Sequence, residues 1–170
     1  MSRSRVYSTE AIVLRRAGMG EADRLLTILT PGMGKLRVIA KGARKITSRK
    51  AGHVELFTRV KLLLAQGRTF DIVSQAETVE PHRPLREDLQ RGMMAHYFAE
   101  LTEQFAQEDN EDAPLYETLA QGLMWLSVCA HLPLAARAFE MRLLTLAGYQ
   151  PAGVQVRGHR SQVGGRHKTG

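Results

Sequence analysis

The spacing of hydrophobic residues changes near residue 81, and this change constrains the fold more than any other feature of the sequence. Before it, apolar and β-branched residues occur in short runs separated by glycine and proline, which is typical of β-strands. These runs occupy residues 11–16, 24–30, 35–40, 56–64 and 70–79. Five short strands in about eighty residues predict a small barrel such as the OB-fold. We therefore expect residues 1–80 to form this barrel.

After residue 81 the apolar residues recur at helical spacing, and three prolines mark the expected helix starts, Pro84, Pro114 and Pro133. The predicted inward faces are Leu85, Leu89, Met93, Tyr97, Leu101 and Phe105; Leu115, Leu119, Leu123 and Leu126; and Leu134, Ala138, Met141 and Leu144 or Thr145. Gly148 is expected to cap the last helix. The predicted fold class is α+β: an N-terminal five-stranded OB-fold barrel followed by a helical domain over residues 81–151.

The last segment, residues 152–170, is rich in glycine and basic residues and has little apolar mass. Such a composition cannot bury enough surface to fold, so a disordered basic tail is predicted. The acidic segment 107–112 between the first two helices is expected to be a solvated loop.

Charge is divided between the two halves. Residues 1–80 contain 15 Lys and Arg against 7 Asp and Glu, whereas residues 81–151 contain 5 against 10. A cationic first half suits a polyanion such as nucleic acid. The predicted DNA contacts lie in one stretch that lacks acids: Lys35, Arg37, Lys41, Arg44, Lys45, Arg49 and Lys50.

The period of two in residues 35–40 supports this prediction. It places Leu36, Val38 and Ala40 on one face and Lys35, Arg37, Ile39 and Lys41 on the other. We expect Gly42 to let a ligand approach the backbone. A simpler alternative is that Lys35 and Arg37 keep an edge strand soluble.

Only three aromatic residues, Tyr7, Phe57 and Phe70, occur in the first eighty. This number is too small for an extensive base-stacking surface. Nucleic-acid binding is therefore expected to depend on the phosphate backbone and to be indifferent to base sequence.

Several kinds of chemistry lack a basis in the sequence. Cys129 is the single cysteine, which excludes an intrachain disulfide and a multi-cysteine zinc site, and we expect it to be a buried, inert thiol. The histidines lack metal-ligand spacing, and no carboxylate cluster suggests a nuclease. We expect no enzyme activity, no metal and no cofactor. Neither a membrane-spanning run nor a secretory signal is found, so a cytoplasmic location is expected.

Several segments in order along residues 6–151 resemble the RecO family of bacterial DNA repair and recombination mediators. They are Ala11-Ile-Val-Leu-Arg-Arg16, Gly20-Glu-Ala-Asp-Arg-Leu-Leu-Thr27, Thr30 through Gly34-Lys35, Ala40-Lys-Gly-Ala-Arg44, Leu85-Arg-Glu-Asp-Leu89, Phe139-Glu-Met-Arg-Leu-Leu144 and Gly148-Tyr-Gln-Pro151. Relative to the family, the sequence is expected to be shortened at its C-terminus, where members continue with further helices.

The resemblance implies an OB-fold that binds single- and double-stranded DNA, a helical domain behind it, and a location at the nucleoid. It implies annealing of complementary strands and, with RecR, assistance in loading RecA. It also implies that Arg137, beside Leu134 and Met141, receives the acidic tail of the single-strand binding protein. Alternatively, Met141 is a plain helix–helix core contact.

A second hypothesis for the whole chain is a non-enzymatic adaptor. In this alternative the barrel contacts RNA and the helices dock a protein.

Overall fold

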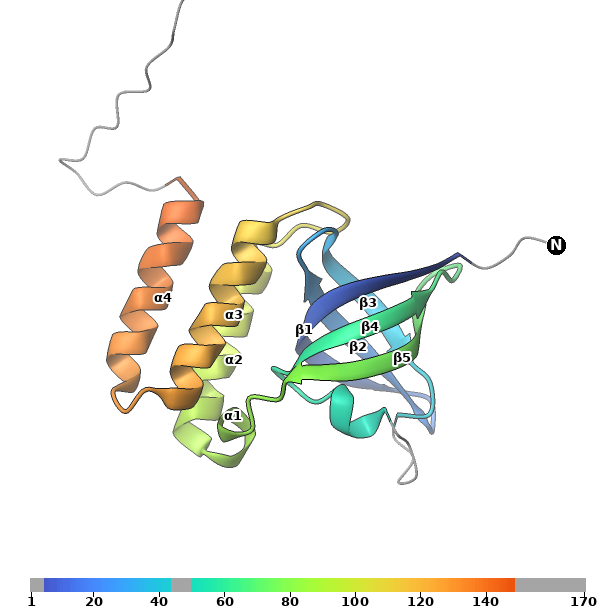
Figure 1. The fold of residues 1–170 in the computed structure, drawn as a ribbon, viewed down its shortest axis with the longest axis horizontal. Helices are drawn as coiled ribbons and strands as arrows, with labels where there is room; N and C mark the ends of the chain where they lie inside the picture. The colour runs from blue at the N-terminus through green and yellow to red at the C-terminus, as the bar shows by residue number, and fades with distance from the viewer. Residues whose placement is uncertain (1–4, 44–49, 149–170) are drawn as a thin grey trace, which may run out of the picture.

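The computed structural model describes residues 5–43 and 50–148. Its strands are β1 (Val6–Met19), β2 (Asp23–Thr30), β3 (Gly34–Ala40), β4 (Arg59–Ala65) and β5 (Asp71–Glu80). A short 3-10 turn, η1 (Ala51–His53), precedes β4, and the helices are α1 (Pro84–Glu87), α2 (Leu89–Phe105), α3 (Ala113–Val128) and α4 (Leu132–Leu146). The helices lie together on one side of the barrel, with α4 farthest from it (Figure 1). The predicted α+β class, an OB-fold barrel followed by helices, is confirmed.

The strands form a closed barrel in the order β1-β2-β3-β5-β4. Closure depends on the length of β1, which pairs with β4 through residues 6–12 and with β2 through residues 12–19. The predicted first strand, residues 11–16, is therefore too short. Gly18 does not interrupt it, because the hairpin with β2 continues to the pair Met19 and Asp23.

Residues 11–14 of β1 supply side chains to two different cores. Ala11 and Val13 point into the barrel, while Ile12 and Leu14 belong to the core beneath the helices. A bulge at Leu14 shifts the register against β2 at this point. Because both faces of the strand are buried, its sequence is a continuous apolar run rather than an alternating one.

The first predicted helix is divided in two. Asp88 has an extended backbone, and its side chain accepts a hydrogen bond from the N–H of Arg91 at 3.0 Å. Asp88 is thus the N-cap of α2, an arrangement that Asp favours, and it ends α1 after a single turn. The expectation of one helix that starts at Pro84 and continues with a single inward face to Phe105 was wrong.

The predicted inward faces of α2 and α4 were also largely wrong, although Leu85 is buried and Leu101 is partly buried against the helical core. On α2, Leu89 is 79% exposed and Met93 is 65% exposed, whereas the buried side chains include Ala95 and Phe98. On α4, Leu134 and Met141 are 64% and 54% exposed; the buried residues are Ala135, Ala136, Phe139 and Leu143. Both helices carry apolar residues on two faces, and the buried face of each contains alanines and one phenylalanine, joined on α4 by Leu143.

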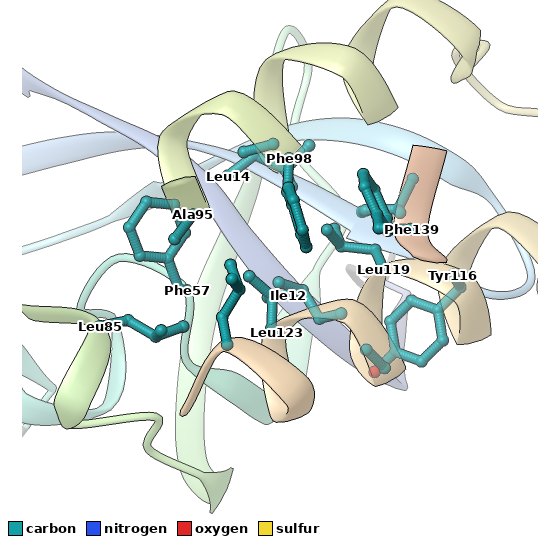
Figure 2. Packing of buried hydrophobic residues seen from close by; sticks show 14 of the residues in the cluster. Ile12, Leu14, Phe57, Leu85, Ala95, Phe98, Tyr116, Leu119, Leu123 and Phe139 are labelled. Atoms are coloured by element: carbon teal, nitrogen blue, oxygen red, sulfur yellow. The ribbon is translucent and has the colours of Figure 1, made fainter. Parts of the chain in front are cut away.

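Helix α3 packs against both α2 and α4, and its predicted core residues are confirmed as buried: Leu115, Leu119, Leu123 and Leu126. At its centre, Gly122 leaves room for Phe98 and Phe139, whose rings stack with centroids 3.9 Å apart. Figure 2 shows these rings beside Leu119 in the shared core, with Ile12 and Leu14 of β1 nearby. The helices therefore pack directly on the outer face of β1, and the two share one hydrophobic core.

One further expectation needs correction: Cys129 is partly exposed rather than buried, because it follows α3 at its C-terminal end. The acidic segment 107–112 is an exposed loop, as expected. It is also anchored, since the N–H of Lys35 donates to the carbonyl of Gln107 at 3.0 Å and that of Asp112 donates to Pro31 at 3.2 Å. These backbone bonds fix the segment to the turn between β2 and β3.

Gly148 has a φ of 82° and donates to the carbonyl of Thr145, which confirms the predicted helix cap. Within the described ranges, none of the helices is long and apolar enough to cross a membrane. The division into domains at residue 81 stays a prediction, and the expected tail, residues 152–170, lies outside the described residues.

Candidate nucleic-acid interface

The outer face of β3 presents basic side chains, as its alternation predicts. Val38 and Ala40 are buried in the barrel and Leu36 is half-buried, whereas Arg37 and Lys41 are exposed. The hairpin with β2 fixes this orientation through the pairs Leu26 with Val38 and Ile28 with Leu36.

The helices cover the neighbouring part of the wall. Leu29 of β2 and Ile12 of β1 are fully buried in the core that the barrel shares with the helices, and Thr27, opposite Arg37 in the ladder, is buried as well. Arg37, by contrast, is exposed. It lies on the part of β3 that is next to β5 and to the turn between β4 and β5.

That turn, residues 66–70, is held tightly. The carboxylate of Asp71 accepts hydrogen bonds from the N–H of Gly67, at 3.1 Å, and from the Tyr7 hydroxyl. A Cβ on Gly67 would lie 2.0 Å from the carbonyl oxygen of Phe70, so only glycine fits. Burial, together with the Asp71 carboxylate, raises the pKa of Tyr7, which keeps this hydroxyl a donor.

Arg68 and Phe70, which sequence reasoning missed as site residues, come from this turn and line a polar cavity of about 300 Å³ with Lys35 and Arg37. Glu108 and Asp109 of the docked acidic segment line the same cavity. The sequence feature that could have indicated Arg68 is a basic residue next to a glycine in a predicted turn. The sequence does not show that this turn lies beside β3, because β3 and β5 pair across a long stretch of chain.

Lys35 is a weaker candidate than its sequence position suggests. It is half-buried, and its Nζ lies 3.9 Å from Oε1 of Glu103 on α2. The same carboxylate oxygen lies 2.5 Å from Arg15. Glu103 thus partly neutralises Lys35.

The turn after β3 corrects the expectation for Gly42. Its N–H donates to Oδ1 of Asp23 at 2.9 Å and is therefore occupied by the protein. Its φ of 70° explains why a glycine stands there. The side chain of Lys41 remains exposed at the start of this turn.

The structure says less about the four remaining predicted DNA contacts. Arg44, Lys45 and Arg49 lie outside the described residues. Lys50 is described, and its Nζ donates to the carbonyl of Val73 at 2.8 Å, so its ammonium group is held against β5. A role for Lys50 in DNA binding stays a prediction.

On the helical side, Leu134, Arg137 and Met141 lie on an exposed face of α4. The alternative that Met141 is a helix–helix core contact was wrong, because this side chain is 54% exposed. A mainly apolar cavity of about 540 Å³ lies between α2 and α4, lined by Met93, Met94, Tyr97, Leu132, Pro133 and Ala136 together with the polar Gln90 and Glu140. Leu134, Arg137 and Met141 are not among the residues that line this cavity.

Among the residues that the structure describes, no group of three or more His, Cys, Asp or Glu side chains could hold a metal ion. The candidate interface consists of basic side chains and one aromatic ring, with the carboxylates of Glu108 and Asp109 in the same cavity.

Comparison with protein families gives two matches that together span most of the chain. Residues 1–82 match the family model described as Recombination protein O N terminal, and residues 86–155 match Recombination protein O C terminal. The chain belongs to the RecO family. The resemblance that the sequence motifs indicated is thus confirmed.

Curated relatives in the RecO family agree. The DNA repair protein RecO of Roseiflexus sp. (strain RS-1) is 48% identical over 149 residues, which cover 88% of this chain and 52% of that protein. That of Desulforudis audaxviator is 46% identical over 145 residues, covering 85% and 58%. That of Bifidobacterium longum (strain NCC 2705) is 40% identical, covering 86% and 62%. The chain thus spans about half to three fifths of the length of these relatives.

Proposed function

We propose that this chain is a recombination mediator of DNA repair that binds single- and double-stranded DNA through β3 and the turn between β4 and β5. The observation that supports this most is the position of two exposed cations outside the part of the barrel that the helices cover: Arg37 on β3 and Lys41 in the turn that follows it. Arg68 lies beside Arg37 and extends the basic surface across the barrel.

Annealing of complementary strands follows from this surface. Two single strands repel each other through their phosphates, and cations that neutralise both lower this barrier without reading bases. The proposed activity therefore requires no catalytic residue and no cofactor. Together with RecR, the bound chain would assist the loading of RecA onto DNA, at the nucleoid in the cytoplasm.

The helical side supplies a site for the acidic tail of the single-strand binding protein. Arg137 is exposed on α4, one helical turn from Pro133, which lines the apolar cavity between α2 and α4. A guanidinium beside an apolar groove suits a carboxylate that follows apolar residues. Leu134 and Met141 extend the apolar surface next to Arg137.

The test is an annealing assay with complementary oligonucleotides coated by the single-strand binding protein. The variant Arg37→Ala/Lys41→Ala removes two phosphate contacts worth about 1.4 kcal/mol together, so its affinity and annealing rate should fall by roughly tenfold. The control Lys61→Ala/Arg83→Ala removes two exposed charges on β4 and before α1. Equal effects of both variants would mean that only the net charge matters, and absent annealing by the unaltered chain would contradict the proposal.

A further inference from the structure

Arg37 and Phe70 form a stacked pair on the open wall of the barrel. The guanidinium carbon of Arg37 lies 5.4 Å from the centroid of the Phe70 ring, within the range of a cation–π contact. Arg37 is exposed and Phe70 is half-buried, so the ring supports the guanidinium from the protein side.

The strand register fixes this pair. β3 and β5 run parallel, and Val38 pairs with Asp71. Arg37 and Phe70 each precede one member of that pair, so their side chains leave the sheet at neighbouring positions on the same side. The tight turn closed by Gly67 and Asp71 then holds the Phe70 backbone in place.

The charge of Arg37 is available to a ligand. Within residues 5–43 and 50–148, Arg37 has a neutral ring as its partner and makes no ion pair, in contrast to Lys35 with Glu103. Of the three aromatic residues in the first eighty, Phe57 is buried in the helical core and Tyr7 is bonded to Asp71. Phe70 is the one left beside the cations.

We propose that Arg37 and Phe70 form a stacking site for one unpaired base of single-stranded DNA, with Arg68 and Lys41 receiving the flanking phosphates. This inference rests on the proposed DNA binding and adds a base contact to it. Bases stack on guanidinium planes and on aromatic rings, and the loop between β4 and β5 is a usual oligonucleotide site in OB-folds. The polar cavity of about 300 Å³ lined by Arg37, Arg68 and Phe70 gives the strand room at this point.

The site distinguishes single strands from duplex. A paired base is already stacked within its helix and cannot reach Arg37, whereas every unpaired base has a π-face to offer. The chain would still bind DNA of any base sequence, but its affinity would depend on a base contact as well as on phosphate contacts. The expectation of purely backbone-led binding is thereby refined.

The test compares two labelled 15-mer oligonucleotides with equal numbers of phosphates, oligo-dT and a fully abasic strand, by fluorescence anisotropy with the whole chain. Stacking contributes about 1–3 kcal/mol per base, so the chain should bind oligo-dT at least about fivefold more tightly than the abasic strand. Phe70→Ala and Arg37→Lys should abolish this preference, and Phe70→Tyr should retain it. Arg37→Lys keeps the charge but loses the planar stack.

Arg68→Lys is the matched control, because it changes the same residue type outside the stacked pair and should leave the preference intact. Equal affinity of the unaltered chain for both strands, with a normal salt dependence, would overturn the stacking site and leave the proposed DNA binding in place. The stacking site is also overturned if Phe70→Ala and Phe70→Tyr, both folded by circular dichroism, weaken the binding of the two strands equally. Failure to bind either strand would overturn both proposals.

Discussion

The backbone N–H of Gly42 donates a hydrogen bond to Oδ1 of Asp23, at 2.9 Å. Asp23 begins β2 and Gly42 lies in the turn that follows β3, so this bond connects both ends of the hairpin. Ala43, next in the chain, is buried against the barrel core. The bond therefore helps to fix the position of Lys41, which precedes Gly42 in the same turn.

Replacing Asp23 should loosen this turn. Asp23→Ala leaves the Gly42 N–H without its acceptor, and we expect a loss of about 1 kcal/mol in the free energy of unfolding and a weaker affinity for single-stranded DNA. Asp23→Asn retains an acceptor oxygen and should lose much less. Urea denaturation and DNA anisotropy measure the two effects. Glu21→Ala, an exposed residue of the turn between β1 and β2, is the control, and an Asp23→Ala variant that matches it in both measurements would contradict this role.

The carboxylates of Glu108 and Asp109 line the same cavity as Arg37 and Arg68, so they should weaken phosphate binding there. Neutralising them in Glu108→Gln/Asp109→Asn is expected to increase affinity for single-stranded DNA severalfold at low salt, and less at high salt because ions screen exposed charges. Asn suits the positive φ of 54° at position 109. Glu111→Gln, in the same segment but outside the cavity, should have little effect; unchanged affinity in the double variant would show that the acidic segment does not oppose binding.

Gly122 is a glycine in the interior of a helix, where alanine is ordinarily more stable by about 1 kcal/mol. The opposite result is expected here. A Cβ at this position would lie 2.7 Å from Cδ2 of Phe139 and 3.1 Å from Cδ2 of Phe98, so Gly122→Ala should disturb the stacked rings and destabilise the chain by about 1–3 kcal/mol. Thermal or urea unfolding measures this. Gly52→Ala places a Cβ in open space and should change stability by less than about 0.5 kcal/mol; a stabilised Gly122→Ala would refute the packing described for α3.

His82 should make stability depend on pH. It is buried, its Nδ1 donates to the carbonyl of Phe57 at 2.7 Å, and burial lowers its pKa below the ordinary 6.5. As pH falls below 6.5, the unfolded chain therefore binds a proton before the folded chain does, and the free energy of unfolding decreases.

The measurement is urea denaturation at several values of pH on either side of 6.5, for the unaltered chain and for His82→Asn. Asn tolerates the positive φ of 47° at this position and does not titrate. The unaltered chain should lose more stability on acidification than the variant. Parallel pH profiles would exclude His82 as the cause.

The sequence was most informative where burial follows a single local pattern. The alternation in β3 predicted which side chains of 36–41 point outward, and the leucines of α3 predicted its core face, because α3 has neighbours on both sides. The side on which Leu14 is buried could not be predicted from the local pattern, since it depends on a bulge in β1 and on a second core beneath the helices.

The errors have a common physical origin. On α2 and α4, long apolar residues at every fourth position predict the core face, but Met93 and Met141 are exposed, and Phe98 and Phe139 pack inward around Gly122. The spacing of apolar residues along a helix identifies an apolar face, but it does not show whether another part of the chain packs on that face. Phe70 was missed for a related reason: its proximity to Arg37 arises from a parallel pairing between distant strands, which local patterns do not encode.

The most direct test of DNA binding by this barrel is fluorescence anisotropy of a labelled single-stranded oligonucleotide, titrated with the chain at several salt concentrations. Each phosphate contact contributes about −0.7 to the slope of log affinity against log salt, so four to six contacts predict a slope of roughly −3 to −4. Arg37→Ala/Lys41→Ala should reduce the slope by about 1.4, whereas Lys61→Ala/Arg83→Ala should leave it unchanged. A folded chain that does not bind at low salt, or whose affinity is independent of salt, would contradict the account.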